Sequence, residues 1–192
     1  MFFFHNRLLF HSFKLFLTIL PVENISFFNN EFTLSVKSCY VFSVLKFLKQ
    51  HTHCQFNVLV SVTAVDYLHQ LNRFELNYDL LSLIFNNRLR IKVYLDELEL
   101  VESCEHLYKA ASWYECEVWD MFGIYFTNHS NLKRILTDYG FEGYPLRKDF
   151  PLCGFIEIKY NELHKRIVTN SIELAQEYRT FNFLSPWASS QT

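Results

Sequence analysis

Hydrophobic positions change from a two-residue spacing to a helical spacing early in the chain. Residues 31–36 (EFTLSV) alternate between apolar and polar side chains, which is typical of a half-buried strand. From about Ser38 the spacing becomes helical, and polar side chains occupy one side of the segment. The apolar side carries Val41, Val44, Leu45 and Leu48. The pattern therefore predicts a short strand followed by an amphipathic helix.

Three further stretches have the composition of strands: residues 55–65, 73–85 and 89–95. In the first, one side of the strand is expected to carry Phe56, Val58, Val60 and Val62. In the third, one side is expected to carry Leu89, Ile91, Val93 and Leu95. Asn86-Asn87 tolerates positive φ and predicts a tight hairpin between the second and third strands.

Helical spacing returns after these strands. It runs through Leu98, Val101, Cys104, Leu107, Tyr108 and Ala111. Ser112 and Glu115 then have the Ser-x-x-Glu spacing of a capping box, which predicts the start of a second helix. One face of that helix carries Tyr114, Val118, Met121 and Phe122. Gly123 follows at the position of a left-handed C-cap.

The order of these elements predicts the fold class. A strand, a helix, three strands and a helical region are typical of an α+β fold, with helices on one face of a small, mostly antiparallel sheet. All four glycines lie between Gly123 and Gly154, where aromatic side chains alternate with charges of both signs. This composition predicts an irregular strap, residues 123–152, that lies against another surface and is ordered only when docked.

The chain is expected to have three parts. Residues 1–30 form an N-terminal apolar segment, residues 31–122 the α+β domain, and residues 123–192 the strap followed by a long extended C-terminal arm. Within the arm, residues 161–170 are interpreted as a charged connector, and residues 172–183 as an extended segment without a core.

Three alternatives exist for the first 20 residues, which are rich in Phe and Leu and contain no acidic residue. A helix that docks on a partner subunit needs only an apolar stripe, and we favour this interpretation. A cleavable mitochondrial targeting peptide and a membrane-surface helix remain open. No uncharged apolar run is long enough to cross a membrane.

Composition narrows the class of function. Half of the 192 residues are hydrophobic and 18% are aromatic, so some aromatic side chains are expected to face partners. The formal net charge of −2 gives no indication of nucleic-acid binding. Five cysteines at wide spacings, without Cys-x-x-Cys, predict free thiols rather than an iron–sulfur or zinc site.

Candidate chemistry is sparse. Glu115, Glu117 and Asp120 resemble acid/base carboxylates, but no nucleophile stands beside them. The run His51-Thr52-His53-Cys54 resembles half of a metal site without a second ligand pair, so we interpret it as a polar loop. His129 alone is interpreted as a hydrogen-bonded structural residue.

Two long motifs carry a family resemblance. Residues 115–122 (ECEVWDMF), followed by His129, Lys133 and Ile135-Leu136, resemble the signature of the thirty-kilodalton subunit of respiratory complex I. Residues 136–152 (LTDYGFEGYPLRKDFPL) resemble its second hallmark, closest to the mitochondrial form. The resemblance continues weakly from about residue 40 to residue 187.

The resemblance implies the same fold and a non-catalytic core structural subunit in the peripheral arm of NADH:ubiquinone oxidoreductase. Its place would be on the matrix side of the mitochondrial inner membrane, beside the forty-nine-kilodalton subunit and the subunit with the terminal iron–sulfur cluster. This chain would bind no cofactor, whereas the complex uses NADH, FMN, iron–sulfur clusters and ubiquinone. The alternative is a stand-alone oxidoreductase or hydrolase that uses the acidic helix 115–120.

The charged residues of the two motifs, together with one tyrosine, are the expected subunit interface. They are Glu115, Glu117, Asp120, His129, Lys133, Arg134, Asp138, Tyr139, Arg147, Lys148 and Asp149. The sequence departs from the family pattern at Cys116, where Arg is usual, and at Ser130, where Pro is usual. Without that Arg the helix lacks a local cation. We therefore expect Lys133, Arg134, Arg147, Lys148 or a partner's Arg to reach Asp120 or Glu117.

Overall fold

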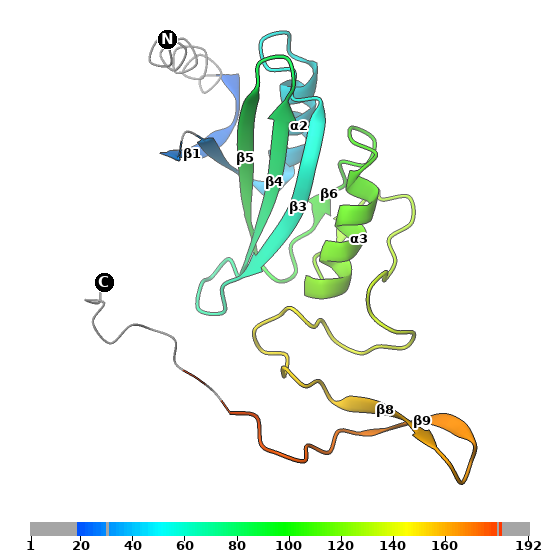
Figure 1. Cartoon of the computed structure of the whole chain (residues 1–192). Helices are drawn as coiled ribbons and strands as arrows, with labels where there is room; N and C mark the ends of the chain where they lie inside the picture. The colour runs from blue at the N-terminus through cyan, green and yellow to red at the C-terminus, as the bar shows by residue number, and fades with distance from the viewer. Residues whose placement is uncertain (1–18, 30, 180, 182–192) are drawn as a thin grey trace. The chain divides into compact units, whose positions relative to one another are not determined.

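A five-stranded sheet organises the first part of the computed structural model, which describes residues 19–29, 31–179 and 181 (Figure 1). The strands are β1 (Val22–Phe28), β2 (Glu31–Val36), β3 (Val58–Asp66), β4 (Phe74–Ser82) and β5 (Asn87–Leu95), and their order is β1-β2-β5-β4-β3. Neighbouring strands are antiparallel except β2 and β5, which are parallel. The predicted α+β class with a mainly antiparallel sheet is confirmed.

One face of the sheet and two helices share a single core. A short 3-10 helix, η1 (Ser38–Tyr40), leads into α2 (Val41–Gln50), and the second helix is α3 (Ala111–Phe122). The predicted apolar faces of α2 and β5 are buried, as are alternate residues of β4. These side chains exclude water together, and α2 lies against one face of the sheet (Figure 1).

The β3 prediction was right about the strand and wrong about its faces. Val60 is 47% exposed, whereas Leu59 and Val62 are buried. The pairing of β3 with β4 shifts between Leu59 and Ser61, where a bulge inserts one extra residue. Because side chains alternate with a period of two, one extra residue moves the following side chains to the opposite face.

The β4–β5 connection lies where the asparagines predict it. Ser82 pairs with Asn87, so four residues connect the strands, and Asn86 has φ of 50°. Asn87 is itself the first residue of β5. The predicted hairpin and positive φ are thus confirmed at Asn86, within a loop that carries three large apolar residues.

The predicted helix over residues 98–111 is wrong. Val101–Glu102 forms β6, which pairs in parallel with β7 (Phe126–Thr127). The N–H of Val101 donates to the carbonyl of Tyr125, and the N–H of Ser103 donates to that of Thr127. Pairing with a segment about 25 residues away therefore outweighs the helical spacing. Val101, Cys104, Tyr108 and Ala111 still face the core, whereas Leu98 is exposed.

The predicted start of α3 was wrong, and its predicted end is confirmed. Ala110 is the N-cap residue and no side chain caps the helix, so the capping box predicted at Ser112 is wrong. Gly123 ends the helix with φ of 82°, and its N–H donates to the carbonyl of Trp119. This is the left-handed C-cap that the glycine predicts.

The N-terminal segment contributes a strand that the pattern did not predict. β1 lies within the stretch expected to dock on partners, yet it pairs with β2 as the edge strand of the sheet. Most of its residues are exposed. Residues 1–18 lie outside the described residues, and docking of the segment 1–30 stays a prediction.

The described residues form two compact units, one ending at Phe150 and one beginning at Pro151. In the second, β8 (Ile156–Asn161) and β9 (Arg166–Ser171) form an antiparallel hairpin. The charged connector predicted for residues 161–170 is therefore wrong. Asn161 accepts the N–H groups of Leu163 and His164 and so stabilises the turn. Among the described residues, no helix combines the length and apolarity that crossing a bilayer requires.

Candidate functional site

Two buried carboxylates define the site on α3. Glu115 and Asp120 are five residues apart, so their side chains point in directions about 140° apart around the helix. Both are 0% exposed. A buried carboxylate must be hydrogen-bonded or neutralised, and the two residues meet this requirement in different ways.

Asp120 binds the strap. Its Oδ2 accepts the N–H groups of Ile135 (3.2 Å), Leu136 (2.7 Å) and Thr137 (3.0 Å). Its Oδ1 accepts the hydroxyl of Thr137 at 2.6 Å and lies 3.3 Å from Nη1 of Arg134. The expectation that a strap cation reaches Asp120 is confirmed, and the cation is Arg134.

The pKa of Asp120 is lowered by these contacts. Burial alone raises the pKa of the carboxyl, but hydrogen bonds from the hydroxyl and N–H of Thr137 and from the neighbouring N–H groups outweigh it. Asp120 is therefore an anion that neutral backbone donors and one guanidinium hold in place.

Glu115 faces the residues that follow β6. Its carboxylate accepts the hydroxyl of Ser103 at 2.5 Å, the N–H of Cys104 at 2.8 Å and the Cys104 thiol at 3.1 Å. Burial raises the pKa of Glu115, and these neutral donors offset the effect only in part. Its role is thus to tie α3 to the segment after β6, and not to cap its own helix.

His129 is a structural residue, as predicted. Its Nε2 donates to the carbonyl of Ser112 at 3.2 Å, and its Nδ1 accepts the N–H of Asn131 at 3.1 Å. Both ring nitrogens are thus hydrogen-bonded within this chain. Its Nε2 lies 3.8 Å from Glu115, beyond hydrogen-bonding distance, and its side chain is 1% exposed.

The two departures from the family pattern each have a partner inside the chain. Cys116 is buried, and its thiol donates to the carbonyl of Asn131 at 3.5 Å. Ser130 donates its N–H and its hydroxyl to Glu105, at 3.0 and 2.8 Å. A proline at position 130 has neither an N–H nor a hydroxyl, so both of these hydrogen bonds depend on the departure.

A second charged cluster holds the end of the strap. Arg73 donates two hydrogen bonds to Asp66, at 2.8 and 3.0 Å, and pairs with Asp149 at 3.0 Å. Asp66 also accepts the N–H of Lys148 at 2.8 Å. The Arg73 guanidinium holds the pKa of Asp66 below its usual value, although burial opposes this shift. The cluster thus joins residues 148–149 to β3 and to the residue preceding β4.

Arg147 completes this cluster. It donates to the carbonyl of Phe122 at 2.6 Å, pairs with Glu97, and lies over the rings of Tyr144 and Phe74. Asp66, Arg73 and Glu97 were missed as site residues. The Arg147-Lys148-Asp149 run indicated a charged contact, but only the fold shows that these partners belong to the same chain.

The strap up to Phe150 is therefore fixed on its own unit. The expectation that it is ordered only when docked on another surface needs correction, because α3, Asp66 and Arg73 supply much of that surface. Phe141, Tyr144 and Phe150 are partly buried. Phe141 and Phe150 pack on each other, and Tyr144 packs on Trp119.

The remaining predicted interface residues lie at the surface. Glu117 and Lys133 are exposed, and no hydrogen bond or ion pair joins their side chains to the described residues. Tyr139 is fully exposed, and its N–H donates to the side chain of Asp138. The side chains of Glu115, Asp120 and His129 are instead enclosed by this chain.

The acid/base and metal interpretations find no support in the geometry. Glu115 and Asp120 have donors on both oxygens and no exposed surface, which leaves no room for a substrate. Cys54 is buried in the α2–β3 connection, and burial raises the pKa of its thiol to about 11, away from ready ionisation. None of the five cysteines takes part in a disulfide.

Comparisons with known proteins agree with the motifs. Residues 34–155 match the family described as "Respiratory-chain NADH dehydrogenase, 30 Kd subunit". The chain is 51% identical over 166 residues to NADH-ubiquinone oxidoreductase subunit 9 of Reclinomonas americana, covering 86% of this chain and 81% of that protein. It is 51% identical over 148 residues to NADH dehydrogenase [ubiquinone] iron-sulfur protein 3 of Arabidopsis thaliana, covering 77% and 78%.

A solved structure agrees with the fold. A chain of the membrane-bound sulfane sulfur reductase, an archaeal respiratory membrane complex, matches with a TM-score of 0.64 and 25% identity. The match covers 74% of this chain and 85% of that one. Together with the family match and the two signature motifs, this shows that the chain belongs to the 30 Kd subunit family of respiratory-chain NADH dehydrogenase.

Proposed function

We propose that this chain braces the quinone-reducing module of NADH:ubiquinone oxidoreductase. As a member of the 30 Kd subunit family it is a core subunit of the peripheral arm of that enzyme, and its subunit 9 relatives support a mitochondrial location. The proposal sets it on the matrix side of the inner membrane. It also sets it beside the forty-nine-kilodalton subunit and the subunit that carries the terminal iron–sulfur cluster. NADH, FMN, iron–sulfur clusters and ubiquinone belong to the whole complex.

The observation that carries the proposal is that the strap is held by hydrogen bonds to its own unit on its inner side and is exposed to solvent on its outer side. Asp120 and the Arg73 cluster hold it from inside, whereas Tyr139, Leu136 and Leu146 are each more than half exposed. A surface that is already ordered loses little conformational entropy when a partner binds. Such a surface suits a permanent brace between subunits, and the buried carboxylates act as its internal supports.

The charged residues that face outward give this brace its specificity. Glu117 on α3 and Lys133 in the strap are exposed and have no hydrogen-bond or ion-pair partner among the described residues. An Arg or Lys of a neighbouring subunit facing Glu117, and a carboxylate facing Lys133, complete the interface that the proposal requires.

Native electrophoresis of mitochondrial membranes tests the assembly. We expect mass spectrometry to find this chain in the band that oxidises NADH, together with the forty-nine-kilodalton subunit. A chain that migrates only by itself contradicts the proposal. To test the neighbour, a photoreactive residue at position 139 is expected to cross-link to the forty-nine-kilodalton subunit in the assembled enzyme, and cross-links to other subunits alone overturn that placement.

A further inference from the structure

The register of the β8–β9 hairpin separates its side chains into two unlike faces. Ile156 pairs with Ser171, Ile158 with Thr169, and Tyr160 with Ile167. Paired residues of antiparallel strands point to the same side, so these six residues form one face without a charge. The opposite face carries Glu157, Lys159, Asn161, Arg166, Val168 and Asn170. We call the first the uncharged face.

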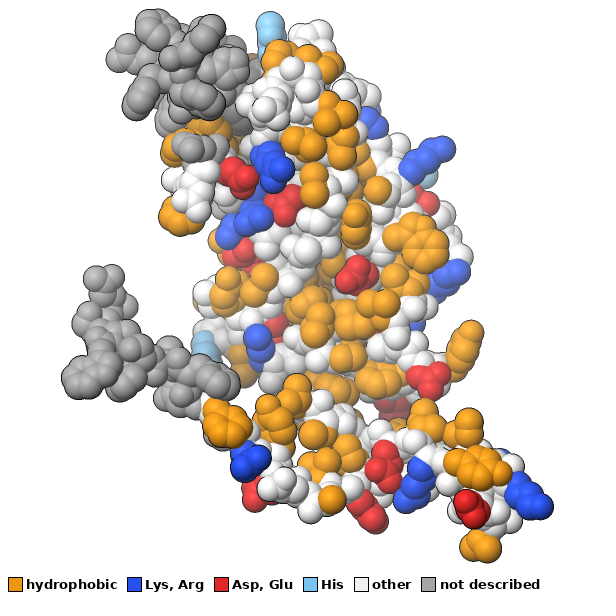
Figure 2. Space-filling view, in the orientation of Figure 1, with side chains coloured by type: hydrophobic (Ala, Val, Ile, Leu, Met, Phe, Trp, Pro, Cys, Tyr) orange, Lys and Arg blue, Asp and Glu red, His pale blue; other side chains and the backbone are white. Residues whose placement is uncertain are grey.

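The uncharged face is open to solvent in this chain. Ile156, Ile158, Tyr160 and Ile167 are between 56% and 69% exposed. Hydrophobic side chains are visible along the hairpin beside the charged ones (Figure 2). Four large apolar side chains on one small hairpin are a cluster that soluble surfaces rarely present without a partner.

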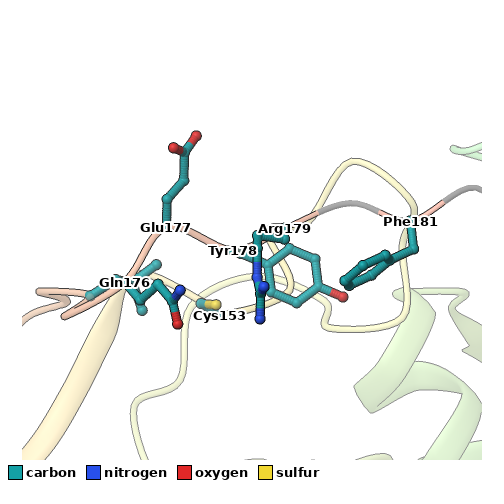
Figure 3. A pocket seen from close by; sticks show the side chains of 7 residues that line it. Cys153, Gln176, Glu177, Tyr178, Arg179 and Phe181 are labelled. Carbon is teal, nitrogen blue, oxygen red and sulfur yellow. The ribbon is translucent and has the colours of Figure 1, made fainter.

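The rest of the second unit supplies no core for the hairpin. None of its described residues, Pro151 to Arg179 and Phe181, is buried. A cavity of about 260 Å³ lies in this unit (Figure 3). Its lining consists of Cys153, Leu174, Gln176, Glu177, Tyr178, Arg179 and Phe181, and includes neither strand. A two-stranded hairpin without a third strand or a helix is marginally stable in water, and the described residues of this unit offer no core to stabilise it.

We propose that the uncharged face of the hairpin packs against an uncharged apolar surface of another subunit of the same enzyme. The inference rests on the proposed function, which makes this chain part of a permanent assembly. The charges favour a protein over an anionic membrane. Residues 156–171 carry three basic side chains and two acidic ones, and Lys159 is already paired with Glu157 at 3.3 Å. This leaves little net attraction for lipid headgroups.

The charged face then remains in water or at the rim of the contact. Its Glu157–Lys159 pair lies on the side away from the proposed partner and needs no desolvation. The geometry therefore predicts a one-sided contact, in which a glutamate impairs assembly at one residue of β8 and is tolerated at the next.

Two neighbouring variants test this one-sidedness in the full chain expressed in mitochondria. Ile158→Glu places a charge on the uncharged face, and Lys159→Glu places the same side chain on the opposite face. We expect Ile158→Glu to lower the amount of chain incorporated into the complex about tenfold, because a carboxylate cannot be buried against an apolar surface. We expect Lys159→Glu to remain within about twofold of the wild type. Circular dichroism of the purified chains checks that both variants keep the α+β unit.

The outcomes separate this inference from the proposed function. If the wild-type chain is absent from the complex, the proposed function fails. If the wild-type chain and both variants assemble equally, the brace stands and the docking inference is wrong. A photoreactive p-benzoylphenylalanine in place of Tyr160 identifies the occupant. A cross-link to a different subunit supports the inference, whereas labelling of lipid only, of a second copy only, or of nothing contradicts it.

Discussion

The strap up to Phe150 and the arm from Pro151 look alike in sequence and differ in what holds them. Both alternate aromatic, charged and turn-forming residues. Two buried carboxylates, Asp120 and Asp66, accept hydrogen bonds from the backbone of the strap and fix it. The arm has a regular hairpin but no buried residue among those described. Regular secondary structure is thus a poor guide to which segment the chain can order by itself, and buried polar contacts are the better one.

The largest effect is expected from Asp120→Ala. This change leaves three N–H groups and the Thr137 hydroxyl without their acceptor, and Arg134 keeps the carbonyl of Gly143. We expect the free energy of unfolding of the first unit to fall by about 4 kcal/mol. Tryptophan fluorescence during urea denaturation measures it, since Trp113 and Trp119 lie in α3. A loss below about 1 kcal/mol means that Asp120 does not hold the strap.

Arg73→Ala is the next largest, and Arg90→Ala is its control. Removal of Arg73 leaves Asp66 buried with only the N–H of Lys148, so we expect a loss of about 3 kcal/mol. Arg90 pairs with Asp79 in a similar geometry, but its side chain is 45% exposed, so we expect less than about 1 kcal/mol. Equal losses for the two variants exclude a special role for the buried cluster.

Gly123→Ala tests the close approach of the strap to the end of α3. An added Cβ lies 2.7 Å from Nη2 of Arg147 and 2.7 Å from the ring of Tyr144, at φ of +82°. We expect a loss of about 2 kcal/mol, compared with about 1 kcal/mol for Gly140→Ala. Gly140 has φ of +70° and open space around it, so it isolates the backbone effect. Similar losses of stability for both variants show that the strap moves away from the added Cβ at Arg147 at no cost in free energy.

The smallest expected effect is on the pH dependence of stability, in which the two buried carboxylates, Glu115 and Asp120, differ. The pKa of Glu115 is raised above its ordinary value of 4.5, so its contribution to stability is present below pH 4.5 and is lost as the pH rises through the folded pKa. The pKa of Asp120 is lowered, so its contribution is present above pH 3.8 and is lost as the pH falls toward the folded pKa.

We therefore expect Glu115→Gln to change stability by less than about 1 kcal/mol at pH 7 and to be relatively less stable at pH 4. Asp120→Asn is expected to behave oppositely, with its deficit greatest at neutral pH. Denaturation curves of both variants and the wild type at pH 4 and pH 7 provide the comparison. Parallel pH trends for the two variants contradict the assignment of opposite shifts.

The sequence predicted those helices and strands whose buried face repeats at a short, regular spacing. α2 and β5 each bury one face against the core, so the spacing of Val41 to Leu48 and of Leu89 to Leu95 is a direct record of the packing. β6 and β7 were missed because their pairing joins residues about 25 apart. The hairpin of β8 and β9 was missed because the charged residues of one face concealed the alternation on the other.

The site was predicted in outline only. The missing Arg at position 116 required a cation for Asp120, and the structure selects Arg134 from four candidates in the chain. The three backbone donors to Asp120, and the Asp66–Arg73 pair, depend on how the strap folds back and have no local pattern. Recognition of the motifs identified the strap as important, and the buried carboxylates show what fixes it.

Hydrogen exchange monitored by mass spectrometry tests the central claim, that this chain orders the strap whereas a partner orders the hairpin. In the isolated chain we expect slow exchange for residues 135–137 and 148, whose N–H groups donate to Asp120 and Asp66, and fast exchange for residues 156–171. In the assembled complex both regions are expected to be protected. A strap that exchanges as fast as the hairpin in the isolated chain, or a hairpin already protected there, contradicts the account.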